Sequence, residues 1–257
     1  MQMKHLLNIL LVIMALASLT ACEDHRVPQS PQTPQGVRYR MVKSEIFNFR
    51  SRHVRTFSYR PDGKLASYTI DRNQTSGLPV QTVNLNYNDD GRLISLQSTG
   101  PATFPYVKFR QEYGYDDKGM VTIVNILTDS DDSGNFKPVQ SYRFSYDGTN
   151  KFPVSVSVFN INDNTLTKDR DIFYTYQNGN IIEQKSGSDT PQQYSYDDKP
   201  NPYNQLSMIE IGPEVFSKNN VQISFRPATY NSDGLLIERN NSSGATFYQE
   251  RIAYETW

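Results

Sequence analysis

The chain has 257 residues, with 26 basic and 27 acidic side chains and a formal net charge of −1. This balance excludes the strongly basic surface with which proteins capture nucleic acid. The 17 tyrosines and 13 phenylalanines favour a β-protein with an aromatic core, because these residues favour strands and the tyrosine ring is apolar with a polar tip.

The first residues have the pattern of a secretory signal. Lys4 precedes an apolar run over residues 6–19, which is shorter than the roughly 20 residues of a membrane-spanning helix. Residues 19–22, Leu-Thr-Ala-Cys, resemble a bacterial lipobox, in which the signal is cut before the cysteine and the cysteine is lipidated. Cys22 is the only cysteine, so it has no disulfide partner in the chain. We therefore predict a lipoprotein signal peptide over residues 1–21 and lipidation at Cys22.

A Pro-rich tether follows the predicted cleavage site. Residues 22–36 contain three prolines and few apolar side chains, which is typical of an extended spacer that does not pack. Glu23 and Asp24 resemble the export signal of surface lipoproteins of Bacteroidetes-type bacteria. We predict an outer membrane lipoprotein of the cell envelope, either surface-exposed, which is slightly favoured, or periplasm-facing.

The rest of the chain, residues 37–257, repeats a short pattern about every 28 residues. An aromatic or aliphatic residue, any residue and a tyrosine are followed by three residues, a glycine, any residue and an aliphatic residue. The pattern's glycines step by 28 residues from Gly63 to Gly91 (91 − 63) and again to Gly119 (119 − 91). Looser copies surround Gly148 and Gly179, and the last full copy surrounds Gly234. A recurring period of this length predicts one supersecondary unit used several times.

Each unit has the pattern of a β-hairpin. Val83, Leu85 and Tyr87 alternate with polar residues, which predicts a strand with one buried face. The Asp-Gly or Asn-Gly pairs that follow supply the positive φ of a tight turn. Consecutive hairpins predict a single all-β domain, an antiparallel meander of about sixteen strands.

A meander of this length should curl, because sheets twist and rarely stay open beyond about ten strands. We expect it to close toward a barrel or to fold over as a sandwich. A short helix or ordered loop is expected over residues 202–218, where the repeat breaks down. The polar outward-facing residues do not fit the apolar belt of a membrane-spanning barrel.

The repeat resembles a known pattern. Residues 115–119, Tyr-Asp-Asp-Lys-Gly, resemble the YD repeats of the Rhs family. Together with the lipobox, the chain is similar to Bacteroidetes-type cell-envelope lipoproteins with degenerate YD repeats, and residues 196–203 resemble a signature of those proteins. Their domain is one of unknown function, so the resemblance implies an all-β fold and an envelope location, with no catalytic residues to carry over.

The residues that usually carry catalysis are sparse. The three histidines are His5 in the signal, His25 in the tether and His53 in the repeat domain. One histidine excludes a multi-histidine metal site and leaves one candidate for a histidine-based triad. With Cys22 lipidated, no thiol nucleophile remains, and we predict no catalysis and no cofactor.

One acidic loop partly matches a calcium-binding pattern. Asp129, Asp131 and Ser133 fall at the first, third and fifth positions, with Gly134 at the sixth. Gln140 stands at the twelfth position, where a bidentate glutamate normally closes the site. We therefore favour a solvated connection between strands and no metal, and keep calcium as the alternative.

Five aromatic residues lie outside the inward-facing rows of the repeats. They are Tyr68, Tyr106, Tyr203, Phe216 and Trp257. Such residues either stack on a sugar or a partner protein, or fill the ends of the core, and we favour core filling.

The function that these features favour is a lipid-anchored binding or scaffold module with a glycan or envelope-protein partner. One alternative is an envelope hydrolase acting on glycans, with paired carboxylates or His53 in its active site. A second alternative is a structural or assembly protein that pairs through an exposed sheet edge, with the terminal strands near residues 37–47 and 246–257 as candidates. The N-terminal lipid is the expected membrane contact, and no nucleic acid partner is expected.

Overall fold

A computed structural model describes residues 38–48, 51–72, 80–100, 107–148, 151–206, 209–223, 226–241 and 247–257. The predicted signal peptide, Cys22 and the tether lie outside these residues. Strands dominate, as the alternating sequence predicts, and helix is limited to η1 (Pro202–Leu206) and α2 (Pro213–Phe216) in the described residues. Both fall inside the region where the repeat breaks down.

Seventeen strands lie in the described part of the chain. In chain order they are β1 (Tyr39–Asn48), β2 (Ser51–Tyr59), β3 (Leu65–Arg72), β4 (Gln81–Tyr87), β5 (Leu93–Thr99), β6 (Lys108–Tyr115), β7 (Val121–Asp129), β8 (Lys137–Ser145), β9 (Ser155–Asn162), β10 (Thr165–Gln177), β11 (Asn180–Ser186), β12 (Gln192–Gln193), β13 (Tyr196–Pro200), β14 (Asn219–Val221), β15 (Ala228–Tyr230), β16 (Leu236–Asn241) and β17 (Tyr248–Thr256).

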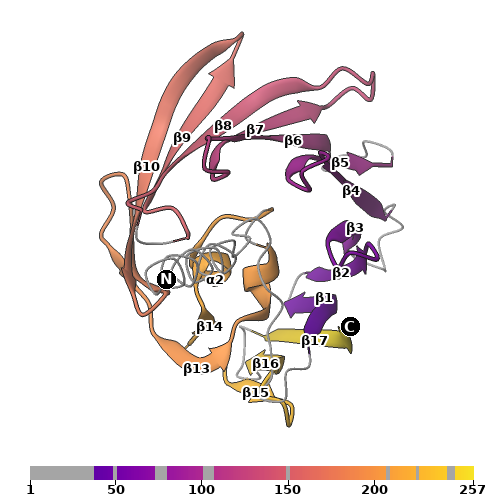
Figure 1. The fold of residues 1–257 in the computed structure, drawn as a ribbon, viewed down its shortest axis with the longest axis vertical. Coiled ribbons are helices and arrows are strands. Elements are labelled where there is room, and N and C mark those ends of the chain that lie inside the picture. Colours follow the sequence, from indigo (N-terminus) through magenta and orange to yellow (C-terminus); the bar gives the residue numbers. More distant parts are fainter. Residues whose placement is uncertain are drawn as a thin grey trace, which may run out of the picture.

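Fifteen of these strands form one antiparallel sheet. From β12 to β1 each strand pairs with its neighbour in the sequence, and β1 then pairs with β17, which is followed by β16 and β15. The sheet curls into an open ring and is not closed into a barrel, because its end strands β12 and β15 do not pair (Figure 1). The separate pair β13–β14 lies between the two ends. The predicted curled antiparallel meander is confirmed.

The terminal strands are not sheet edges. β1 pairs with β2 and with β17, and β17 also pairs with β16, so both have partners on each side. The candidate edges near residues 37–47 and 246–257 are therefore paired on both sides where the structure describes them, because the first and last described strands pair with each other. This pairing does not favour the alternative in which a terminal strand adds to a partner.

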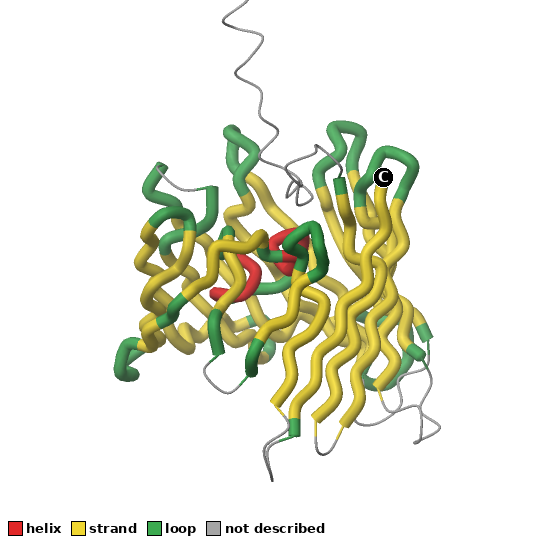
Figure 2. The backbone as a smooth tube through the Cα atoms, turned by 90° about the horizontal axis from the view of Figure 1, so that it is seen from below, coloured by secondary structure: helices red, strands yellow, loops and turns green. Residues whose placement is uncertain are grey.

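The tight turns of the repeats gather on one edge of the sheet. Because alternate connections of a meander share an edge, the turns at Gly63, Gly91, Gly119 and Gly234 lie together. We call this edge, with residues 60–64, 88–92, 116–120 and 231–235 and with Arg38 and Trp257, the turn rim. Figure 2 shows the strands running from this rim, where the C-terminal residue lies among the loops, to the opposite rim.

The turn geometry explains the spacing of the repeat. Gly63 has φ +83°. Its N–H donates to the carbonyl of Arg60 at 2.9 Å, and the N–H of Arg60 donates to the carbonyl of Lys64 at 2.8 Å. The strand register shifts between Ser58 and Tyr59. This is a turn followed by a glycine bulge, and the glycine supplies the left-handed backbone conformation that other residues rarely adopt.

The residue after the repeat tyrosine also has a structural role. The side-chain oxygen of Asn88 accepts the N–H of Arg92 at 2.8 Å, and Asp116 accepts the N–H of Met120 at the same distance. Such side-chain caps satisfy turn amides that the strands do not pair. An Asp or Asn in this place therefore reflects turn chemistry.

The concave face of the ring is the core. Inward residues such as Met41, Phe57, Val83 and Leu96 are at most 4% exposed. The inner segment, residues 201–206 and 209–217, packs against this face, and Phe216 of α2 stacks on Phe152 with ring centres 5.5 Å apart. The inner segment thus completes the core. No helix of the described ranges is both long enough and apolar enough to span a bilayer.

Candidate functional site

A row of tyrosine hydroxyls links neighbouring hairpins along the turn rim. The pairing of β3 with β4 ends at Ser67 and Asn84. Beyond that point, the hydroxyl of Tyr87 donates to the carbonyl of Leu65 at 2.7 Å. The tyrosine therefore continues the connection between two hairpins where strand pairing has stopped.

The same contact recurs around the ring. Seven tyrosines donate to a backbone carbonyl of the preceding hairpin, and an eighth donates to a carboxylate. The pairs are Tyr59–Met41, Tyr87–Leu65, Tyr115–Leu93, Tyr146–Val121, Tyr176–Pro153, Tyr196–Ile181, Tyr254–Leu236 and, through its side chain, Tyr230–Asp197. We call these eight tyrosines the tyrosine girdle.

The girdle crosses the gap between the two ends of the sheet. Tyr196 of β13 donates to Ile181 of β11 at 2.6 Å, and Tyr230 of β15 donates to Asp197 of β13. The other oxygen of Asp197 accepts the N–H of Asn220 in β14 at 3.2 Å. Side chains therefore join the sheet ends that backbone hydrogen bonds leave apart.

Burial keeps the girdle hydroxyls protonated. It raises the pKa of Tyr115 and of Tyr196 to about 12, because the charged phenolate is poorly solvated in these positions. Burial also raises the pKa of Tyr87 and Tyr176. The hydroxyls are therefore permanent donors at ordinary pH.

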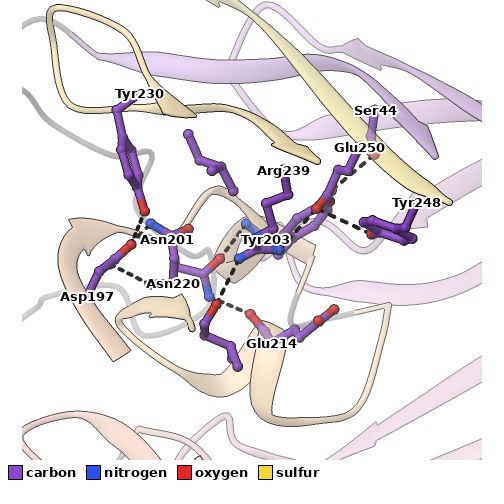
Figure 3. Close-up of polar contacts among 12 residues, drawn as sticks. Ser44, Asp197, Asn201, Tyr203, Glu214, Asn220, Tyr230, Arg239, Tyr248 and Glu250 are labelled. Atoms are coloured by element: carbon purple, nitrogen blue, oxygen red, sulfur yellow. Dashed lines mark hydrogen bonds and ion pairs between the residues drawn. The ribbon is translucent and has the colours of Figure 1, made fainter. Parts of the chain in front are cut away.

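A buried ionic cluster anchors the inner segment to the sheet (Figure 3). Arg239 of β16 and Glu250 of β17 are 3% and 2% exposed, and the guanidinium Nη1 lies 3.1 Å from the carboxylate Oε2. Tyr203 of η1 donates to the other oxygen of Glu250, and Tyr248 donates to Oε2 at 3.4 Å. Ser44 of β1 shares a hydrogen bond with the Tyr203 hydroxyl at 3.1 Å.

The arrangement of the buried ionic cluster indicates a structural role. Burial, followed by the charge of Glu250, raises the pKa of Tyr203 well above its ordinary value. Both carboxylate oxygens of Glu250 already accept hydrogen bonds from neighbours, and Arg239 also donates to the carbonyl of Val221 at 3.4 Å. Tyr203 of the inner segment and Arg239 contact this carboxylate, and Glu250 is 2% exposed.

Asparagines hold the inner segment in its bent path. Asn201 donates to the carbonyl of Ser217 at 2.9 Å and accepts the N–H of Tyr203 at 3.0 Å. Asn220 donates to the carbonyl of Pro200 at 3.2 Å. These polar contacts close the turn that places Tyr203.

His53 lies on β2 among basic groups. Its Nε2 is 3.1 Å from the Ser51 hydroxyl. Burial, Arg72 and Arg55 lower its pKa, in that order. A histidine-based triad needs a carboxylate to orient the ring, and the neighbours of His53 are a serine and two arginines.

The acidic loop that partly matches a calcium-binding pattern is a capped turn. Asp129 is 1% exposed, and its two oxygens accept the N–H groups of Ser133 at 3.1 Å and Gly134 at 2.9 Å. Hydrogen bonds from Ser133 lower the pKa of Asp131. Within the ranges that the structure describes, no three His, Cys, Asp or Glu side chains form a group that could hold a metal ion.

Four of the five aromatic residues outside the inward rows are described. Tyr68, Tyr203 and Phe216 are 8%, 6% and 3% exposed, so core filling is confirmed for them. Trp257 is 44% exposed at the turn rim. Tyr106 lies outside the described residues.

The sequence analysis missed the buried ionic cluster, although one signal was present. Glu250 falls in the inward row of β17 with Tyr248, Ile252 and Tyr254, at the period of two that marks a buried strand face. A carboxylate in such a row requires a buried partner. The identity of that partner, Arg239, depends on strand pairing.

Comparisons with known proteins give a likeness of structure. No protein-family model and no curated protein matches the sequence. The chain is similar to a porin-like protein from Bacteroides uniformis, with 16% identity and a TM-score of 0.49 over 90% of this chain and 100% of that chain. It is also similar to a porin-like protein from Bacteroides vulgatus, with 12% identity and a TM-score of 0.39 over 84% of this chain and 98% of that chain.

A third similar structure is a complex described as TcdB2-TccC3-Cdc42. It matches 76% of this chain but only 12% of its own chain, with 14% identity and a TM-score of 0.34. At these identities no residue role carries over to this chain.

Proposed function

We propose that the chain is a lipid-anchored, non-catalytic scaffold or binding protein of the bacterial cell envelope. The observation that carries this proposal is the use of the interior polar groups. The girdle hydroxyls, Glu250, Arg239 and Tyr203 are all engaged in contacts that hold hairpins or the inner segment in place. These interior polar groups therefore stabilise the fold.

The lipid anchor is supported by the sequence before the repeat domain. The signal pattern, the lipobox ending at Cys22 and the spacer over residues 23–36 stand in the order of an exported, tethered protein. The anchored body then presents a curled sheet with a polar outer face, and its partner is a glycan or an envelope protein.

Membrane fractionation tests the anchor. Cys22→Ser should release the protein from the membrane fraction and abolish incorporation of labelled fatty acid, because the lipid is the proposed attachment. Ser51→Ala, far from the lipobox, is the matched control and should remain in membranes. A Cys22→Ser protein that stays in the membrane fraction contradicts lipid anchoring.

Binding and catalysis are separated by one assay on the full chain. Envelope glycans and envelope proteins are immobilised and tested for retention of the purified protein, and the soluble glycans are then analysed for new reducing ends. Retention without bond cleavage supports the proposal. New reducing ends that persist through purification would show an envelope hydrolase instead.

A further inference from the structure

The turn rim carries an exposed tryptophan beside the start of the described chain. Trp257 is 44% exposed, and its backbone N–H donates to the carbonyl of Arg38 at 3.2 Å. Arg38 is the first described residue, so the N-terminal part of the chain joins the sheet next to Trp257. The described chain therefore begins at the rim that carries the exposed tryptophan.

The tryptophan is held in place at the surface. A Cβ atom on Gly63 would lie 2.4 Å from the ring of Trp257, so the ring rests against the turn at a position that only glycine permits. The guanidinium carbons of Arg38 and Arg40 lie 5.5 and 5.6 Å from the ring centre. The ring is positioned by these contacts and still exposes part of its area.

Basic side chains extend from the tryptophan along the rim. Arg60 and Lys64 lie over the ring of Tyr87, at 5.4 and 5.8 Å from its centre. Arg60 pairs with Asp62 at 3.3 Å, and Arg40 pairs with Glu255 at 2.6 Å.

We call Trp257, Arg38, Arg40, Arg60 and Lys64 the rim patch. Two carboxylates, Asp62 and Glu255, pair with two of its four basic groups. The neighbouring turns of the rim add the carboxylates of Asp89, Asp90, Asp116, Asp117 and Asp233, so the positive excess is confined to the patch.

We propose that the rim patch rests on the surface of the lipid bilayer. Tryptophan and arginine suit this position, since an amphipathic ring sits at headgroup level and guanidinium groups bind lipid phosphates. The inference rests on the proposed lipid anchor. The 15 residues between Cys22 and Arg38 span at most about 50 Å, so the tether allows the rim to reach the membrane but does not force it there.

The consequence is a fixed orientation of the body. With the rim patch on the bilayer, the opposite rim points away from the membrane. A second contact also strengthens attachment, because basic groups are attracted to an anionic lipid surface.

Fluorescence quenching in lipid nanodiscs tests the orientation. Trp257 is the only tryptophan of the chain, so the lipidated full-length protein reports on this position without labelling. In discs of phosphatidylcholine and phosphatidylglycerol, lipids brominated near the headgroup should quench Trp257 more than lipids brominated near the chain end.

A reporter at the opposite rim is the matched control. Phe247, 40% exposed before β17, is replaced by Trp in a Trp257→Phe background. Its fluorescence should be unaffected by brominated lipid. The variant Arg38→Gln with Lys64→Gln should lose much of the Trp257 quenching, whereas Lys185→Gln on β11 should not.

The outcomes separate the two proposals. The protein could associate with discs while Trp257 is quenched no more than the Phe247→Trp reporter. In that case the rim patch does not rest on lipid, and the proposed lipid anchor at Cys22 is still supported. If the protein fails to associate with discs, both proposals are wrong. A Trp257 signal that changes only on addition of a glycan or an envelope protein assigns the rim patch to that partner and overturns the bilayer contact.

Discussion

Each girdle tyrosine combines two contributions that no other side chain supplies together. For six of the eight the ring packs against the core, and the hydroxyl reaches an earlier part of the chain, as Tyr87 reaches the carbonyl of Leu65. Phenylalanine would match the ring but would leave the carbonyl without its donor, and an unpaired buried acceptor is costly. This explains why the repeats select tyrosine.

The girdle bond of Tyr87 is testable by removing one oxygen. Tyr87→Phe should lower the free energy of unfolding by about 1 kcal/mol, because the Leu65 carbonyl loses its partner. Urea denaturation followed by circular dichroism measures this change.

Tyr142→Phe is the control for the loss of a hydroxyl. The Tyr142 hydroxyl donates to the side chain of Gln140, which can turn toward water, so the loss of stability should be smaller. Equal losses of stability in Tyr87→Phe and Tyr142→Phe would show that the girdle hydrogen bond contributes no more to the free energy of unfolding than the Tyr142 hydrogen bond does.

The buried ionic cluster predicts a much larger single-residue effect. Glu250→Gln leaves the Arg239 charge buried without its carboxylate and should cost roughly 3–5 kcal/mol, measured by thermal or urea unfolding. Asp62→Asn removes one partner of an exposed pair, with side chains 45% and 43% exposed, and should change stability by less than about 0.5 kcal/mol.

A double variant separates the charge from the packing. Arg239→Met combined with Glu250→Gln removes the unpaired charge and should be less destabilised than the sum of the two single variants. Strict additivity would mean that the two residues do not act as a pair.

At the scale of elements, the hairpin of β9 and β10 extends beyond the neighbouring strand. β11 pairs with β10 only from Ile172 onward, so residues 165–170 have no strand partner on that side in the described chain. A register shift between Lys168 and Arg170 and the charges around it interrupt this edge. Bulges and charges are how proteins prevent edge-to-edge association, so this edge is protected from pairing.

Removing that protection should promote association. Lys168→Val with Arg170→Val makes the edge apolar and raises its strand propensity, so aggregation should increase at equal protein concentration. Light scattering and thioflavin fluorescence over time measure the effect.

The control adds the same two valines to a strand with partners on both sides. Thr82→Val with Asn84→Val lies on β4, where both residues pair with β3 and with β5. This variant should aggregate little more than the original chain. Equal aggregation of both variants would attribute the effect to hydrophobicity alone.

At the scale of the whole molecule, the girdle and the buried tyrosines make the ring sensitive to alkali. Burial raises the pKa of Tyr68, Tyr115 and Tyr196 to about 12. An unfolded tyrosine loses its proton near pH 10. Up to that pH these groups leave the stability unchanged, and above it the unfolded state gains by ionising while the folded state does not.

The free energy of unfolding should therefore fall as pH rises from about 10 to 12, and Tyr68 alone accounts for roughly 3 kcal/mol of this loss. Tyrosinate absorbance and far-ultraviolet circular dichroism recorded together should change in one transition. Gradual ionisation near pH 10 with the β signal intact would contradict the burial of these hydroxyls. The same titration in denaturant gives the ordinary tyrosine behaviour as reference.

Much of the fold was predictable from local pattern. The period of two placed inward and outward residues, and the glycine spacing placed the turns, because both depend on neighbours in the chain. The repeat tyrosines were visible for the same reason, but the carbonyls that they bond lie some 20 residues away, in the neighbouring hairpin.

The sequence by itself determined a β-hairpin repeat with one buried face and a helical interruption near residues 202–218. Only the tertiary structure decided that β17 pairs with β1, that side chains bridge the gap at β13, and that Arg239 meets Glu250. These contacts join segments far apart in the chain, and their energies depend on burial and charge pairing, which local sequence does not fix. The placement of Trp257 beside Arg38 is of the same kind.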